Sequence, residues 1–240
     1  MRTSIQKNNI QETLFWNVDT QYDFMRNDEA YHGKLPVLNA HCIESNLEKI
    51  TAYATRHAVR VVNTGDLHDK NSTELSDNPD YITTFPPHCI RGTLGAEYVP
   101  AVAPKDAYII DWKDESIDTA LLRKSRNIII YKDAFDAFDS ARGNRHTKNI
   151  VGELRPETVV IYGVATNYCV RFAVEGFIQY AKREREHDGR AINLYVVKDA
   201  IKEIPMNNLQ KLLEEWSTRG VQYISTNELI IDATDKPVKQ

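Results

Sequence analysis

The chain has few cysteines and no long apolar run. Only three of its 240 residues are cysteine, namely Cys42, Cys89 and Cys169, and none belongs to a CxxC pair. This scarcity excludes a disulfide framework and a zinc site built from cysteine alone, and it indicates a reducing compartment. No segment has the uninterrupted apolar length of a membrane span, and residues 1–12 lack the apolar core of a leader sequence. We therefore expect a soluble, cytoplasmic protein without a membrane partner.

Positive charge is not in excess either. The 30 basic residues are outnumbered by 34 acidic ones, for a formal net charge of -4, and no dominant basic block is present. Nucleic acid is therefore not an expected partner. No internal repeat or Pro/Gly-rich linker divides the chain, and its hydrophobic content of 42% is enough for a substantial core. We expect residues 1–240 to form a single domain.

What the chain does contain is a series of short, continuous apolar runs. They lie at residues 13–18, 59–63, 108–110, 127–131, 158–162 and 193–197. Continuous runs are typical of strands that are covered on both faces. Helical periodicity is found between them, at residues 37–58, 170–181 and 206–218. The alternation predicts an α/β fold with a mainly parallel, six-stranded sheet, in which the charged segment 182–190 is a solvated loop.

Chemically useful side chains follow four of these runs. Ligands of open parallel sheets bind beyond the carboxyl ends of the strands. The residues found there are Asp19, Asp66, Lys132 and Cys169. We therefore expect the functional site at this edge of the sheet.

Cys169 is the candidate nucleophile. It lies in GVATNYCV, residues 163–170, between a predicted strand and a predicted helix. The backbone N–H groups at a helix N-terminus stabilise a thiolate and can bind a developing oxyanion. The residue type alone leaves open the alternative of a buried packing cysteine.

A base and a cation are also available. Asp19 begins the segment DTQYDF, where it can act as a general base or form a turn or cap. A lysine near the thiol would lower its pKa, and both Lys132 and Lys113 follow predicted strands. The residues alone do not choose between the two lysines.

Two histidine-containing segments suggest a metal site. Asp66 and His68 are two residues apart and point the same way in an extended chain, and His88 follows about one loop later. One carboxylate and two imidazoles suit zinc, iron or manganese and leave positions open for water or substrate. A solvated loop is the alternative for the D-x-H pair taken alone. Cys89, beside His88, is expected to be structural.

Four ordered motifs resemble those of the isochorismatase-like cysteine hydrolases, and within them the nicotinamidases. They are D-x-Q-x-D-F at 19–24, D-x-H at 66–68, P-x-H-C-x-x-G-T-x-G-A-E at 86–97 and G-V-A-T-x-x-C-V at 163–170. The resemblance extends over a core of about residues 14–230 and implies a three-layer α/β/α, Rossmann-like fold. It implies an amidohydrolase that converts nicotinamide to nicotinate and ammonia in NAD salvage and pyridine nucleotide biosynthesis. It also implies a homo-oligomer.

The resemblance assigns a catalytic triad of Asp19, Lys132 and Cys169. Lys132 is preferred over Lys113 because the family's lysine is followed by an aromatic-Ser element, which matches residues 137–140. In the implied mechanism, Asp19 accepts the proton of Cys169, the thiolate attacks the carboxamide, and ammonia leaves a thioester. Water activated by Asp19 then releases the acid.

The resemblance also implies how the substrate is held. A divalent metal, zinc before iron or manganese, would orient it; the implied ligands are Asp66, His68 and His88. A cis peptide is implied at Val164–Ala165, with the backbone N–H groups of Ala165 and Cys169 as oxyanion donors. The implied aromatic clamp consists of Phe24, Phe85 and Phe138.

Three departures from the family pattern concern the pocket. Leu67 replaces the tryptophan of the usual D-W-H, residues 68–75 replace a common H-P-x-x-H-I-S-F, and about twenty residues, 107–126, are added before Lys132. We expect them to alter the pocket wall or entrance more than the reaction class. The alternatives are a related cysteine amidohydrolase for another small amide or cyclic imide product, and a non-catalytic metal- or ligand-binding relative.

Overall fold

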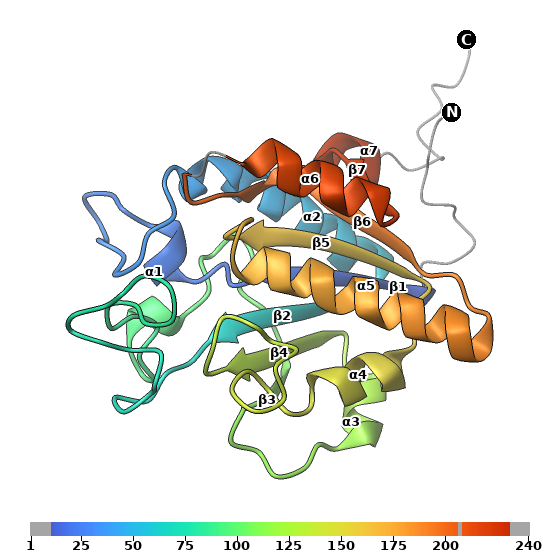
Figure 1. Ribbon diagram of the computed structural model, residues 1–240, viewed down its shortest axis with the longest axis horizontal. Helices are drawn as coiled ribbons and strands as arrows, with labels where there is room; N and C mark the ends of the chain where they lie inside the picture. Colours follow the sequence, from blue (N-terminus) through green and yellow to red (C-terminus); the bar gives the residue numbers. More distant parts are fainter. Residues whose placement is uncertain (1–10, 206–207, 231–240) are drawn as a thin grey trace.

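A parallel sheet forms the centre of the fold (Figure 1). The protein is represented by a computed structural model that describes residues 11–205 and 208–230, so residues 1–10, which carry most of the expectation about a leader sequence, lie outside it. Within the described ranges the sheet has seven strands in the order β3-β4-β2-β1-β5-β6-β7, and all neighbours are parallel. The strands are β1 (Thr13–Val18), β2 (Arg60–Asp66), β3 (Tyr108–Ile110), β4 (Asn127–Lys132), β5 (Thr158–Val164), β6 (Asn193–Lys202) and β7 (Val221–Ile224).

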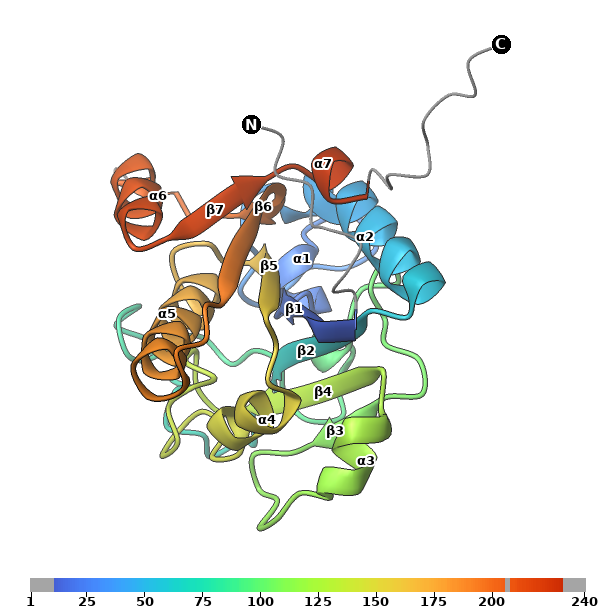
Figure 2. The same cartoon turned by 90° about the vertical axis from the view of Figure 1, so that its right-hand side faces the viewer.

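Helices cover both faces of this sheet. Seen along the strands, α5 and α6 lie on one side and α2 and α7 on the other (Figure 2). The helices are α1 (Tyr22–Met25), α2 (Glu44–His57), α3 (Thr119–Lys124), α4 (Thr147–Leu154), α5 (Cys169–Asp188), α6 (Leu209–Thr218) and α7 (Thr226–Ile230), with 3-10 turns η2 (Ala40–Ile43) and η3 (Leu94–Ala96). The predicted α/β/α layering is confirmed. Across the described ranges, no helix combines the length and the apolar character of a membrane span.

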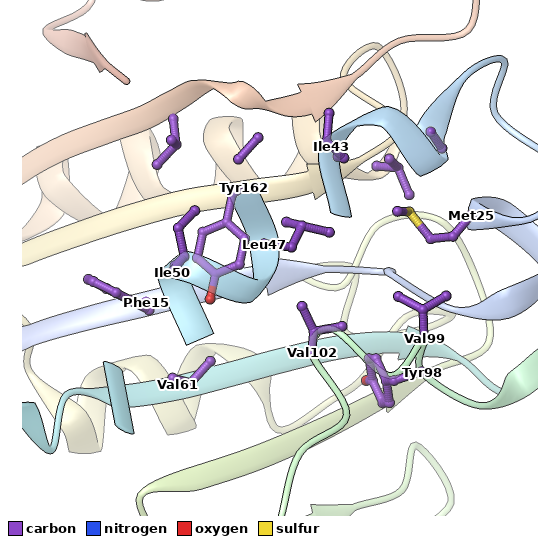
Figure 3. Close-up of a cluster of buried hydrophobic side chains, with 14 of the residues drawn as sticks. Phe15, Met25, Ile43, Leu47, Ile50, Val61, Tyr98, Val99, Val102 and Tyr162 are labelled. Atoms are coloured by element: carbon purple, nitrogen blue, oxygen red, sulfur yellow. The ribbon is translucent and has the colours of Figure 1, made fainter. Parts of the chain in front are cut away.

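The central strand β1 shows why continuous apolar runs form this sheet. All six of its residues are buried. Phe15 belongs to the apolar layer beneath α2, together with Leu47 and Ile50 (Figure 3). Trp16 packs on the opposite face against Phe177 of α5, with ring centroids 4.8 Å apart. Since successive strand residues point to opposite faces, an apolar run without alternation contributes to both cores at once.

Two details of the predicted fold are wrong. The sheet has a seventh strand, β7, which is only four residues long and is half-buried at Gln222 and Tyr223, so it lacks the apolar run used to predict the others. The segment 182–190 is not a loop, because α5 continues to Asp188 and ends at Gly189 in the left-handed conformation. The charged residues 182–188 form the solvated C-terminal end of α5, and the buried apolar stripe of this helix lies in its N-terminal part, between Val170 and Tyr180.

Two of the predicted helices differ at their starts. The helix expected from residue 37 begins as the 3-10 turn η2 and becomes α2 at Glu44. The helix expected from residue 206 is α6, which begins at Leu209; residues 206–207 lie outside the described part.

The parallel strands bring their carboxyl ends to one edge, on the side where α1 lies (Figure 1). A glycine allows β5 to approach β1 closely there. Gly163 has a φ of 120°, and a Cβ on it would lie 2.1 Å from the carbonyl oxygen of Val18. Only glycine fits this position, so the end of β5 lies directly beside the residue that precedes Asp19.

Candidate active site

Asp19, Lys132 and Cys169 meet at the carboxyl edge of the sheet. Lys132, the last residue of β4, places its Nζ 2.9 Å from Oδ2 of Asp19 and 3.8 Å from Sγ of Cys169. The same ammonium forms an ion pair with Asp66. Lys113, in contrast, has a side chain that is 47% exposed. The structure thus brings together the three residues of the predicted triad and separates the competing lysine from them.

Burial and charge set the protonation of these three groups. Burial raises the pKa of the Cys169 thiol well above its usual value, although Lys132 acts to lower it. Burial also raises the pKa of Asp19, against the opposing effect of Lys132 and a hydrogen bond from the thiol. Burial alone would lower the pKa of Lys132, but Asp19 and Asp66 raise it well above its usual value. The resting cysteine is therefore a thiol beside a basic carboxylate, and the expected effect of the lysine is outweighed by burial.

Asp19 is held by the neighbouring strand. The hydroxyl of Thr64 donates to Oδ1 of Asp19 over 2.6 Å, and the backbone N–H of Asp19 donates to the carbonyl of Thr64 over 3.1 Å. Its φ of 49° lies in the left-handed region, which aspartate tolerates better than most residues. The carboxylate faces Lys132 and Thr64, so it is not used as a helix cap.

The rest of the D-x-Q-x-D-F segment fixes the surrounding backbone. Oε1 of Gln21 accepts from the N–H of Asp66 over 2.7 Å, while Nε2 donates to the carbonyls of Asp66 and Ala96 over 2.7 Å each. The buried carboxylate of Asp23 accepts from the N–H of Cys89 over 2.7 Å. Cys89 itself is fully buried, which agrees with the structural role expected for it.

Four buried side chains converge next to the triad. Asp66, His68, Glu74 and His88 each offer one ligand atom, and these atoms lie within 4.8 Å of one another. Oδ2 of Asp66 is 3.9 Å from Nε2 of His68 and 3.6 Å from Nε2 of His88. Nε2 of His68 is buried and has no hydrogen-bond partner among the described residues. The three predicted metal ligands are thus brought together, and Glu74 joins them.

The outer nitrogen of each histidine is already engaged. Nδ1 of His88 donates to the carbonyl of Pro86 over 2.8 Å, and Nδ1 of His68 lies 3.0 Å from Oδ1 of Asp133. A proton on each Nδ1 leaves the Nε2 lone pairs directed at the cluster, as in most metal-bound histidines. Two imidazoles with two carboxylates suit zinc, iron or manganese, so these residues fit a divalent metal.

Glu74 was missed at the sequence level. Burial, with the charge of Asp66 adding to it, raises the pKa of Glu74 to about 8, which is the mark of a buried carboxylate without enough positive charge beside it. The carboxylate of Glu74 also accepts a hydrogen bond through Oε2 from the backbone N–H of Phe135, over 3.0 Å. One sequence feature could have pointed to Glu74. It lies in the segment 68–75, which departs from the family pattern directly after the D-x-H motif.

An aromatic cavity opens in front of Cys169 and the metal-ligand cluster. Two of the three predicted clamp residues, Phe24 and Phe85, line it together with Phe135 and Tyr168. The lining also includes Asp66, Glu74, His88 and Cys169. Cys169 and the candidate ligands Asp66, Glu74 and His88 therefore face the same largely apolar space, as in many small-molecule sites.

Phe138 does not line this cavity. It is buried in the core, where its ring lies 5.9 Å from that of Trp16 and 5.3 Å from that of Phe177. Phe135 lines the cavity instead, and its ring packs against that of Phe172 in a tilted arrangement, with ring centroids 4.9 Å apart. In the sequence DAFDAF the two phenylalanines have the same local surroundings, so the pattern alone could not show which one faces the ligand.

The turn after β5 completes the site. The peptide bond Val164–Ala165 is cis, and both residues line the cavity. The carbonyl of Ala165 accepts from the N–H groups of Tyr168 and Val170 over 3.0 and 3.1 Å. Cys169 is the first residue of the 20-residue helix α5, whose N-terminus favours negative charge at the sulfur and at a nearby oxygen.

Loss of one ligand should weaken metal binding. We expect His88→Ala to reduce affinity for Zn²⁺ or Co²⁺ by at least about 100-fold, since removal of even an outer partner of a metal ligand costs 10–100-fold. Competition with a chromogenic chelator measures this. His187→Ala, at the exposed end of α5, is the matched control and should bind as the wild type does; equal affinity in both variants would exclude His88 as a ligand.

The fold and the site define an α/β enzyme with a candidate cysteine nucleophile next to a group of residues that could hold a metal ion. The isochorismatase domain model matches residues 13–228. The chain therefore belongs to the isochorismatase domain family, as the motifs predicted.

Comparison with individual proteins gives the same family. The chain is 34% identical over 154 residues to the nicotinamidase of Acinetobacter baylyi, a match that spans 61% of this chain but only 59% of that relative. It is 25% identical over 211 residues to the nicotinamidase/pyrazinamidase of Mycobacterium tuberculosis, covering 88% and 97% of the two chains. The crystal structure of the pyrazinamidase of Pyrococcus horikoshii in complex with zinc superposes with a TM-score of 0.63 at 24% identity, over 89% of this chain and 99% of that one. The predicted class of enzyme, a hydrolase of amide carbon–nitrogen bonds, is the class of these relatives.

Proposed function

We propose that this protein hydrolyses nicotinamide to nicotinate and ammonia through a thioester on Cys169. The observation that carries the proposal is the shared cavity. Cys169, with Asp19 and Lys132 behind it, faces the same aromatic space as Asp66, Glu74 and His88, three of the four clustered ligand residues. This space suits a flat ring bearing a carboxamide. Relatives named for nicotinamide and pyrazinamide support the same substrate class.

In the proposed reaction, Asp19 accepts the thiol proton and the sulfur of Cys169 attacks the carboxamide carbon. The charged Lys132 stabilises the thiolate as it forms, and the backbone N–H groups of Ala165 and Cys169 stabilise the oxyanion. The proton on Asp19 then passes to the leaving nitrogen, so that ammonia departs and a thioester remains. Asp19 next accepts a proton from the attacking water, and the acid and the thiol are released.

The metal-ligand cluster is proposed to orient the substrate. Asp66, His68 and His88, joined by Glu74, would hold a divalent ion, with zinc preferred over iron or manganese because a zinc complex is known for a structure of the same fold. When bound, this ion would supply a coordination position for the ring nitrogen of the substrate. Phe24, Phe85 and Phe135 enclose the ring on the remaining sides, in accordance with their place in the cavity lining.

The proposed setting follows from the same chemistry. A reducing compartment such as the cytoplasm keeps a thiol nucleophile from oxidation, and the three cysteines are free. The reaction would serve NAD salvage, with the small amide as the only required partner and with a homo-oligomer as the working form.

The test is ammonia release from purified protein given nicotinamide, pyrazinamide, benzamide and a linear amide. Turnover of nicotinamide and pyrazinamide, with little turnover of benzamide, is expected because benzamide lacks the ring nitrogen. A preference for a linear amide instead would favour the alternative of a related amidohydrolase, for which the replacement of tryptophan by Leu67 is the motivating observation. Inactivity toward all four amides in metal-loaded protein would contradict the proposal.

The aromatic wall should control affinity for the ring. We expect Phe135→Ala to raise KM for nicotinamide about 10-fold with a smaller change in kcat, because one aromatic contact contributes about 0.5–1.5 kcal/mol beyond the area that it buries. Steady-state kinetics measures both constants. The control is Tyr81→Ala, an aromatic residue that is 57% exposed, which should leave KM unchanged. An unchanged KM in Phe135→Ala would remove this residue from the ring site.

A further inference from the structure

The added segment 107–126 packs against the chain that carries the metal ligands. It forms the edge strand β3, a turn and helix α3. All of its residues are described by the structure, and none of them lines the cavity. The expectation that this segment reshapes the entrance is therefore not supported by its position, and its contacts point to a different role.

The main contact is made by Trp112, in the turn that follows β3. Its indole Nε1 donates a hydrogen bond of 2.8 Å to the carbonyl oxygen of Leu67. Leu67 separates Asp66 from His68, and its own N–H donates to the carbonyl of Lys132 over 3.0 Å. The residue between two metal ligands is thus held by β4 through its N–H and by the added segment through its carbonyl.

The position of Leu67 explains why its backbone matters. Its side chain is buried in the apolar layer on the α2 face, at 7% exposure, while Asp66 and His68 contribute to the ligand cluster. Residues two apart in an extended chain point to the same side, so a rotation of the Leu67 peptide would move both ligands. A donor on the Leu67 carbonyl therefore restrains the direction in which the carboxylate and the imidazole point.

Charged groups form a second connection between the same two segments. Lys113 pairs with Asp69, and the guanidinium of Arg91 bridges Asp69 at 3.1 Å and Asp111 at 2.7 Å. The backbone N–H of Arg91 also donates to the carbonyl of His68 over 2.9 Å. Because exposed ion pairs contribute little on their own, the indole hydrogen bond to a buried residue is the contact to test.

We propose that the added segment 107–126 acts as a brace, which holds in place the chain from Asp66 to His68 with its two candidate metal ligands. Trp112 is the positioning residue of this brace. Trp112 would hold the backbone between Asp66 and His68 so that their ligand atoms converge before a metal binds. This inference rests on the proposed metal site and adds a function for a segment outside the cavity. It assigns no chemical step to Trp112.

The test measures metal affinity of the full-length protein and not turnover alone. Trp112→Phe keeps the aromatic ring and removes the N–H donor. We expect its Kd for Co²⁺ and Zn²⁺, from chelator competition, to rise about 10-fold, at the lower end of the 10–100-fold range for outer partners of metal ligands. The visible absorption bands of bound Co²⁺ should also change, since they report ligand geometry and are not moved by a general loss of stability.

The matched control is Trp216→Phe. Trp216 also donates its indole N–H, over 3.2 Å to Glu175, but it lies in α6, outside the ligand cluster and the cavity. This variant should lose thermal stability and bind metal as the wild type does. Unchanged Kd and unchanged Co²⁺ bands in Trp112→Phe would overturn the brace alone. Failure of the wild type to bind either metal would overturn the metal site in the proposed function, and the brace with it.

Discussion

Cys169→Ala should abolish turnover of every amide that the wild-type protein hydrolyses. We expect a loss of at least about 10⁴-fold in kcat, because removing the nucleophile of a covalent mechanism eliminates the main reaction path. The metal-ligand cluster and the core do not depend on the sulfur, so metal affinity and the melting temperature should change little. Ammonia release under saturating substrate measures the loss.

Another cysteine of the same chain is the control for this result. Cys42 is exposed and lies at η2, so Cys42→Ala should retain full activity. Activity of Cys169→Ala within tenfold of the wild type would show that the sulfur is a packing group. The reaction would then have to be assigned to a path without a thioester, with the cluster of Asp66, His68, Glu74 and His88 as the next candidate.

Lys132→Met should have the largest effect on stability of any substitution in the site. The side chain is buried, and its ammonium lies between the carboxylates of Asp19 and Asp66. Methionine would leave two buried carboxylates without their shared cation. Breaking a buried ion pair in this way costs about 3–5 kcal/mol, so we expect a decrease of that size in the free energy of unfolding together with loss of turnover. Denaturant unfolding of the metal-free protein measures the first effect.

The same substitution on the surface is the control for this prediction. Lys182 has a side chain that is 69% exposed and pairs only loosely, at 3.9 Å, with Glu186. Lys182→Met should change the free energy of unfolding by less than about 1 kcal/mol. A Lys132 variant as stable as the Lys182 variant would mean that Asp19 and Asp66 do not both remain charged in the folded protein.

The predicted residues that the structure brings together at one edge of the sheet include three at strand ends. Asp19, Asp66 and Lys132 each end or follow a buried strand, and parallel strands place such residues at one edge. The family motifs indicated the remaining candidate ligands and favoured Lys132 over Lys113. For these residues, the local sequence was enough to predict where they lie in the fold.

Three residues that lie in loops at or beside the site, Glu74, Asp133 and Phe135, were not predicted. Glu74 enters the cluster with Asp66, and Asp133 lies against the outer nitrogen of His68. Both reach these places through backbone paths that have no regular period, so neither helical nor strand spacing indicates where they point. Phe135 was confused with Phe138 because both follow the same dipeptide. The role proposed for Trp112 depends on its hydrogen bond to Leu67, which is 45 residues away in the sequence. A local sequence pattern cannot predict such a contact.

Detection of the thioester on Cys169 is the decisive test of the proposed covalent mechanism. Metal-loaded protein is mixed with nicotinamide in the presence of hydroxylamine, and acid-quenched samples are analysed for nicotinohydroxamate and for an acyl group on the peptide that contains Cys169. A thioester mechanism predicts both products in the wild type and neither in Cys169→Ala. Release of nicotinate and ammonia without hydroxamate or acylated peptide, together with turnover by Cys169→Ala, would contradict it.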